Sequence, residues 1–199
     1  MSVTTAYEYA NNGELMLQVA EYGYLPEPVA DVTYGEGGFW TRYKPTMLYG
    51  SDIRIHDDGG AGFDFRHLPY EDRSMATVVF DPPYKLTGTP STPDMDERYG
   101  TTEPRRWQDV YGLVEEGLDE CCRVADRYVL LKCMDQVCSG AKRWQTMDFT
   151  TYVTLEHDEF TLEDRFDYLH TPRSQPSNRR TLHTLQNSST LLIFRRGKN

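Results

Sequence analysis

The chain has 199 residues, of which 38% are hydrophobic, 26% charged and 13% aromatic. This length and composition predict a single α/β domain with a substantial core, spanning residues 1–199. A formal net charge of −10 argues against a protein that holds nucleic acid by bulk electrostatics. The sequence lacks the long apolar run of a membrane span and the leading segments of a signal peptide. We therefore expect a cytoplasmic protein without a membrane partner.

The cysteines and histidines show no spacing typical of a metal site. There is no CxxC pair among the four cysteines, and Cys121 and Cys122 fall in an amphipathic helical pattern where buried thiols are expected. We expect no zinc, no disulfide and no catalytic histidine.

Helical and strand patterns alternate along the chain. Apolar positions in 107–125 recur at the i, i+3, i+4 spacing of a helix packed on a sheet. The alternation predicts a mostly parallel, doubly wound sheet. In chain order we expect a helix at 14–22, a strand at 29–33, a helix from near Phe39, strands at 46–52 and 77–80, a helix at 107–125, a strand at 128–131, a helix near 138–147, and strands near 149–155, 164–169 and 191–194.

Two long segments match no regular element. Residues 85–106 are rich in proline and glycine, and long loops in compact domains are usually functional or disordered, so we expect a substrate lid there. Residues 171–189 form the second segment, which is basic. From residue 170 to the end there are six basic side chains and no acidic one. This end of the chain is either a locally positive face or a solvated tail.

The run Asp81-Pro82-Pro83-Tyr84 directly follows an apolar strand. Two prolines fix the backbone and remove two competing donors, so the turn places a carboxylate, a carbonyl and an aromatic face together. That arrangement suits a planar amine, which can donate hydrogen bonds to the carboxylate and carbonyl while its ring stacks on Tyr84. The alternative is a strand closed by a Pro-Pro turn without a binding role.

A second set of residues follows the first predicted strand, where a doubly wound sheet binds cofactors. Asp31 is followed by the glycines Gly35, Gly37 and Gly38, which let the backbone approach a ligand closely. The N-terminus of the helix expected next favours a negatively charged group of that ligand, such as a carboxylate. Asp52 ends the next strand, at the distance expected of a ribose-binding acid. The glycine spacing differs from the dinucleotide pattern. A ligand with a ribose and a carboxylate but no pyrophosphate fits best, and S-adenosylmethionine is such a ligand.

These motifs together resemble those of the S-adenosylmethionine-dependent amino-methyltransferases, which methylate exocyclic nitrogens of nucleobases. The resemblance implies a Rossmann-like class I methyltransferase fold with an antiparallel C-terminal strand, and an aspartate in the first catalytic position is typical of enzymes that act on adenine N6. It assigns the cofactor to Asp31, Thr33, Tyr34, Gly35, Gly37, Phe39, Asp52, Ile53, Asp64 and Phe65, and catalysis to Asp81, Pro82, Pro83 and Tyr84.

The resemblance implies a DNA adenine-N6 methyltransferase of the compact bacterial or phage kind, working without a metal. An RNA base methyltransferase that acts on adenine N6 or guanine N2 is the nearest alternative, and a non-catalytic module that binds S-adenosylmethionine is the third. We expect no separate target-recognition domain. Recognition is then left to the two long segments or to a partner subunit, a homodimer included. Phosphate contacts are expected from Arg105, Arg106, Arg173, Arg179 and Arg180.

The sequence also gives expectations for one lysine and three tryptophans. Lys132 ends a predicted strand and is expected to be exposed, although it could reach the active-site mouth. Trp107 and Trp144 fall in helical patterns and are expected in the core. Trp40 either lines the cofactor pocket or anchors the helix expected after the glycines.

Overall fold

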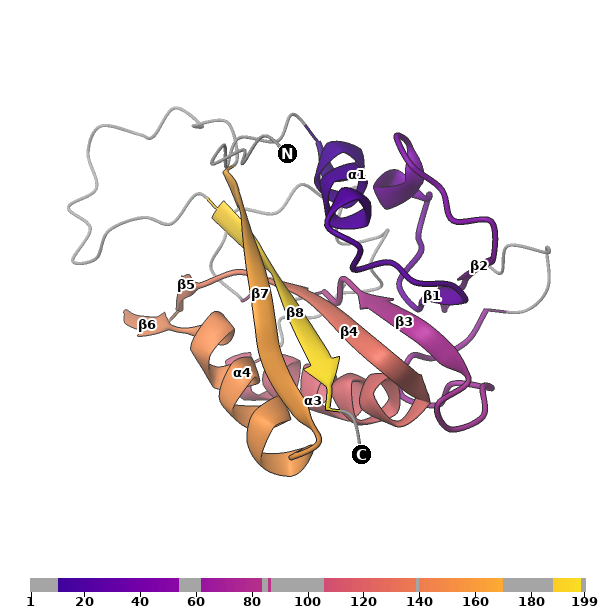
Figure 1. Ribbon diagram of the computed structural model, residues 1–199. Helices are drawn as coiled ribbons and strands as arrows, with labels where there is room; N and C mark the ends of the chain where they lie inside the picture. Colours follow the sequence, from indigo (N-terminus) through magenta and orange to yellow (C-terminus); the bar gives the residue numbers. More distant parts are fainter. Residues whose placement is uncertain are drawn as a thin grey trace.

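The computed structural model describes residues 11–53, 62–83, 86, 106–138, 140–169 and 188–197. Within these residues one six-stranded sheet has the order β2-β1-β3-β4-β8-β7 (Figure 1). The strands β2, β1, β3 and β4 pair in parallel, and β8 is antiparallel to both of its neighbours. The predicted α/β sheet, mostly parallel with an antiparallel C-terminal strand, is confirmed. The strands are β1 (Val29–Asp31), β2 (Leu48–Gly50), β3 (Met75–Phe80), β4 (Ala125–Cys133), β7 (Phe160–Leu169) and β8 (Ser188–Arg196).

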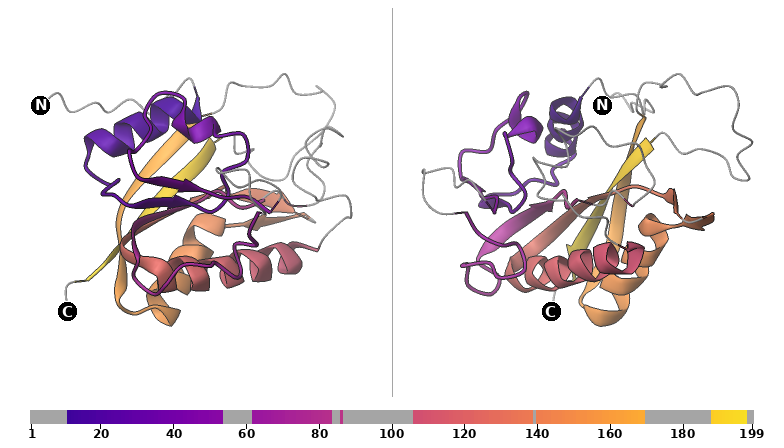
Figure 2. Two further views of the ribbon diagram at one scale, coloured as in Figure 1. Left: turned by 90° about the vertical axis from the view of Figure 1, so that its right-hand side faces the viewer. Right: turned by 180° about the vertical axis from the view of Figure 1, so that it is seen from behind.

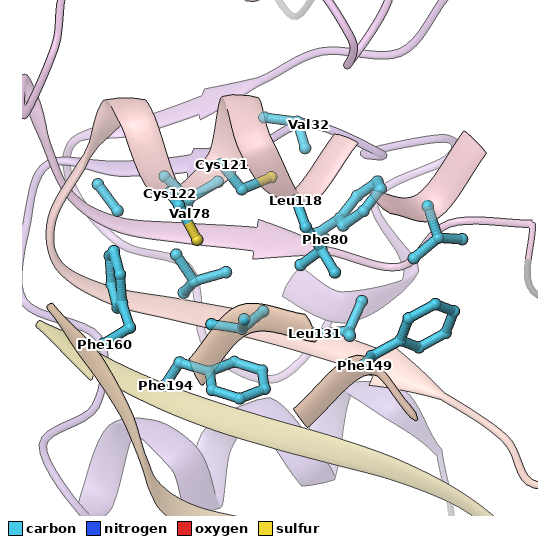
Figure 3. Packing of buried hydrophobic residues seen from close by; sticks show 14 of the residues in the cluster. Val32, Val78, Phe80, Leu118, Cys121, Cys122, Leu131, Phe149, Phe160 and Phe194 are labelled. Carbon is cyan, nitrogen blue, oxygen red and sulfur yellow. The ribbon is translucent and has the colours of Figure 1, made fainter. Parts of the chain in front are cut away.

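Helices cover both faces of this sheet. The helices α3 (Trp107–Val124) and α4 (Gln145–Glu156) lie on one face, and α1 (Asn12–Glu21) lies on the other with η1 (Gly38–Trp40), a single 3-10 turn (Figure 2). Side chains alternate between the faces along each strand. Val78 and Phe80 therefore join the core under α3 and α4 (Figure 3), whereas Val79 joins the core under α1.

The amphipathic helices form where their periodicity predicts them. In α3 the buried positions Val110, Val114, Leu118 and Cys121 make one stripe that packs on the sheet. The helix α1 begins two residues before the predicted 14–22, because the Asn11 side chain accepts a hydrogen bond from the Glu14 backbone N–H at 3.0 Å and caps it.

The predicted strand at 149–155 is wrong, because these residues lie in α4. Their β-branched residues favour a strand locally, yet Phe149 and Val153, four positions apart, are both fully buried on one helical face. Thr150 and Thr154 donate their hydroxyls to helix carbonyls one turn earlier, at 2.6 and 2.8 Å. Tertiary packing therefore overrides local strand preference here.

The predicted helix near 138–147 is also wrong. Its first part belongs to a hairpin of β5 (Gln136–Cys138) and β6 (Ala141–Arg143), and α4 begins only at Gln145. Gly140 takes a positive φ of 75° in the turn, which a glycine adopts without strain. Asp135 accepts hydrogen bonds from the Thr146 backbone and hydroxyl at 2.9 and 3.0 Å, and so fixes the start of α4 from outside the helix.

None of the helices in the described ranges is long and apolar enough to cross a membrane. Both long segments that the sequence singles out fall almost wholly outside these ranges.

Candidate functional site

Three ionisable side chains meet at the carboxyl ends of β1, β3 and β4. The chain runs from β1 to β2 on one side and later returns to β3 on the other, so the topological switch point lies between β1 and β3. The strand residues Val29, Val79 and Leu130 face α1. Side chains two positions apart on a strand point to the same face, so Asp31, Asp81 and Lys132 also lie on the α1 face of the sheet. The fold thus brings predicted cofactor and catalytic residues to the edge where doubly wound sheets bind ligands.

Asp31 is almost completely buried, with 2% of its surface exposed. Its Oδ2 accepts a hydrogen bond from the Trp40 indole Nε1 at 2.7 Å, and its Oδ1 accepts one from the Thr33 backbone N–H at 3.0 Å. The sequence left open whether Trp40 lines the cofactor pocket or anchors the helix expected there. In the structure Trp40 is buried and anchors η1 to this carboxylate.

Thr33 links the glycine loop to the catalytic turn. Its hydroxyl accepts a hydrogen bond from the Asp81 backbone N–H at 2.7 Å and lies 3.5 Å from Asp31 Oδ1. The backbone at Asp81 is therefore held by a residue from the neighbouring strand end. Pro82, which follows, is buried.

The expectation that Lys132 is exposed is wrong. Lys132 is 4% exposed, and its Nζ lies 3.3 Å from Asp81 Oδ2 and 5.2 Å from the centre of the Phe39 ring. A weak signal for this burial is present in the sequence, because the lysine follows an otherwise apolar strand. Burial required the antiparallel β8 alongside, where Leu191 pairs with Lys132.

Two carboxylates therefore share this region with one ammonium. Burial raises the pKa of Asp31 to about 7, against the hydrogen bonds from Trp40 and Thr33, and the nearby Asp81 charge raises it further. Burial also raises the pKa of Asp81, while the Lys132 ammonium opposes that rise. The charge balance favours a ligand that carries positive charge.

The glycine loop is shaped partly by Tyr34. A Cβ on Gly37 would come within 2.7 Å of the Tyr34 hydroxyl, so the ring occupies the space that glycine leaves. Gly35 takes a φ of 52° and has only the Thr33 carbonyl, at 3.9 Å, near its missing Cβ, which leaves room for a ligand. The helix predicted from near Phe39 is wrong, since η1 is one turn and offers no helix N-terminus for a carboxylate.

The other predicted cofactor residues do not all lie on the same face of the sheet as Asp31. Asp52 follows Ser51, whose N–H donates to the Asp31 carbonyl at 2.8 Å, so it lies near the end of β1; Ile53 is exposed. Asp64 is paired with Arg66 at 2.6 Å, and this hydrogen-bonded guanidinium lowers the Asp64 pKa. Phe65 packs on Phe80, with ring centres 4.9 Å apart, in the core under α3 rather than beside Asp31.

Several predicted residues lie outside the described ranges, namely Tyr84, Arg105, Arg173, Arg179 and Arg180. Arg106 is described and is exposed at the start of α3. Pro83 is half-buried.

Some basic and aromatic side chains have roles that the sequence did not predict. Arg196, from the basic C-terminal end, is buried and pairs with Glu159 at 2.6 Å, and Arg195 pairs with Glu163 at 3.1 Å. Trp144 is 46% exposed, so its predicted place in the core is wrong; the Lys142 ammonium lies over its ring, 4.7 Å from the centre.

Among the residues with described positions, no group of three or more His, Cys, Asp or Glu side chains could hold a metal ion.

Structural comparison finds a similar fold in solved structures of other proteins. A Bacillus halodurans C-125 protein named provisionally as a methyltransferase has a TM-score of 0.54 at 13% identity, over 92% of this chain and 99% of that one. A Pyrococcus horikoshii protein named provisionally as an RNA methyltransferase has a TM-score of 0.52 at 12% identity, over 94% and 83%. Magnesium protoporphyrin IX methyltransferase of Synechocystis PCC 6803 has a TM-score of 0.47 at 14% identity, over 94% and 78%.

Family models and curated sequences give no match to the chain. At these identities the structural likeness establishes the fold, and the predicted Rossmann-like methyltransferase fold is confirmed. A fold does not by itself specify a substrate, so the activity has to be argued from the site.

Proposed function

We propose that the protein transfers a methyl group from S-adenosylmethionine to an exocyclic amino group of a nucleobase, and that N6 of adenine in DNA is the target. The observation that carries the proposal is Asp81-Pro82-Pro83 at the carboxyl end of β3, beside the switch point and next to Asp31. The similar fold of two neighbours named provisionally as methyltransferases, with TM-scores of 0.54 and 0.52, supports the same reaction class.

The chemistry of the site fits S-adenosylmethionine. The buried Asp31 and the partly exposed Asp81 stand against one ammonium, and the remaining negative charge suits a ligand with sulfonium and ammonium groups. Gly35 leaves space for close backbone approach, and Asp52, just after β2, would accept hydrogen bonds from a ribose. When bound, S-adenosylmethionine supplies an electrophilic methyl group on its sulfonium.

The catalytic turn would act on the amine. The lone pair of an aromatic amine is delocalised into its ring, which makes the nitrogen a weak nucleophile. Hydrogen bonds from the amine to the Asp81 carboxylate and the Pro82 carbonyl favour a pyramidal nitrogen aligned for attack. Orientation and fixed acceptors of this kind supply most of the catalysis. A base stacked on Tyr84 would first leave its helix, at a cost of a few kcal/mol in duplex and less in a single strand.

A methyl-transfer assay on DNA and RNA side by side, followed by mass spectrometry of the nucleosides, tests the proposal. We expect N6-methyladenine from DNA, with loss of transfer in Asp81→Ala and retention in Asp126→Asn, a change on the exposed part of β4. Methylated bases from RNA alone would favour the alternative RNA activity. Cofactor binding without transfer to either polymer would favour the non-catalytic module.

Salt dependence tests the predicted nucleic-acid contacts. Arg106, exposed at the start of α3, is one of the arginines proposed to touch phosphates. Replacing one such arginine by methionine should reduce the slope of log affinity against log salt by about one, because one fewer phosphate is neutralised. Binding that does not respond to salt would contradict this interface.

A further inference from the structure

The Lys132 ammonium is buried against the catalytic turn. Lysine is almost never fully buried unless it is paired, because an ammonium loses its hydration on burial. Here the side chain is 5% exposed and its one ion pair in the described part of the chain is with Asp81 Oδ2, at 3.3 Å. The Phe39 ring, 5.2 Å away, covers the same ammonium from η1.

Backbone register, rather than a flexible reach, brings the two groups together. Phe80 of β3 pairs with Leu131 of β4 in a parallel ladder, so the next residue on each strand points to the same face at the same level. These residues are Asp81 and Lys132. Among the described residues, Asp81 Oδ2 has this ammonium as its hydrogen-bond donor and Oδ1 has none.

We propose that Lys132 is a positioning residue for Asp81: its ammonium holds Oδ2 and leaves Oδ1 to accept the hydrogen bond from the substrate amine. This inference rests on the proposed function, and it adds a residue from the neighbouring strand to the Asp81-Pro82-Pro83 turn. An ammonium fixed on one carboxylate oxygen selects one rotamer of Asp81. It also keeps that carboxylate charged beside a second acid.

The charged groups that face Asp81 are few within the described ranges. Asp31 faces it from β1, where the Asp81 charge raises the Asp31 pKa; Lys132 faces it from β4 and favours ionisation of Asp81; and the buried Cys133 thiol follows on β4. The nearest part of η1 contributes the uncharged Phe39 ring. Without the ammonium, burial favours the protonated form of Asp81, which accepts hydrogen bonds more weakly.

The first test measures methyl transfer against pH in wild type, Lys132→Met and Lys132→Arg, with Lys142→Met on β6 as a matched lysine control. We expect Lys132→Met to shift the acid limb of the kcat–pH profile to higher pH by about one unit or more, with little change in KM. At pH values on the acid side of that limb, kcat is then about tenfold lower than in wild type. Lys132→Arg keeps the wild-type limb. A Lys132→Met limb that coincides with wild type overturns the proposal, because a merely structural lysine lowers the rate equally at every pH.

The second test does not require turnover. The ¹³Cγ signal of Asp81, identified by its loss in Asp81→Asn, is titrated by NMR in the full chain. We expect a higher midpoint in Lys132→Met than in wild type or Lys142→Met, and Lys132→Gln replaces the methionine variant if that one does not fold. An unchanged midpoint overturns the role of Lys132. A raised midpoint with no methyl transfer by wild type to any polymer supports the coupling of Lys132 to Asp81 and overturns the proposed function instead.

Discussion

Replacing Asp31 by asparagine tests whether the buried carboxylate titrates where its surroundings place it. Burial raises its pKa to about 7 in the folded protein, against an ordinary value of 3.8. Between these values the folded protein holds a proton that the unfolded chain has lost. Stability from this group is therefore present at low pH and falls as the pH rises toward about 7, the reverse of a salt-bridged aspartate.

The size of the effect follows from the two pKa values. Each pKa unit corresponds to about 1.36 kcal/mol. Between pH 5 and pH 8 the titration of Asp31 should lower the free energy of unfolding by roughly 2.5 kcal/mol. Asparagine cannot ionise but keeps a side-chain oxygen for the Trp40 indole, so Asp31→Asn removes the titration and retains that hydrogen bond.

Urea unfolding at pH 5 and pH 8, without cofactor, measures this contribution. The fall in the free energy of unfolding between the two pH values should be smaller in Asp31→Asn than in wild type by roughly 2.5 kcal/mol. Asp126→Asn, at an exposed position, should fall as wild type does. An equal fall in Asp31→Asn and wild type would refute the link between burial and titration at this site.

Three further predictions concern the glycine loop, the electrostatics of the site and the core. Gly37→Ala should lower the free energy of unfolding in urea by about 1–3 kcal/mol, because the φ of Gly37 is 72° and the new Cβ would meet Tyr34. Gly38→Ala, where the new Cβ has open space, should change that free energy by under about 0.5 kcal/mol. Equal effects of the two substitutions would contradict the packing. S-adenosylmethionine should bind more tightly by calorimetry as the pH rises from 6 to 8 and Asp31 ionises, while S-adenosylhomocysteine, with a neutral sulfur, should respond less; identical pH responses would argue against a carboxylate beside the sulfonium. Arg196→Met should cost about 1–3 kcal/mol of unfolding free energy, because it removes a buried guanidinium from the partly exposed Glu159 and from two backbone carbonyls, and the exposed Arg195→Met under about 1 kcal/mol; similar losses would show that burial of the arginine does not set the difference.

Local sequence is enough to predict several of the sheet's main elements and the two aspartates that meet at its edge. Regular apolar spacing is a local property, so the amphipathic α3 and the apolar strands β3 and β4 could be predicted from the sequence. The prolines after Asp81 fix the backbone, and the glycines after Asp31 allow conformations that other residues avoid; both effects are local, so both could be predicted from the sequence. Once the sheet is parallel, strand ends coincide, which places both aspartates at one edge.

Features that depend on distant partners required the folded chain. The threonine-rich α4 is helical because Phe149 and Val153 pack on the sheet and Asp135 holds its start, and neither effect is visible in the local sequence. Likewise, Lys132 is buried because β3 supplies a carboxylate at its level and β8 covers its strand. A lysine after an apolar run looks like a solvated strand end until those neighbours are in place, since burial of a charge is set by the groups around it.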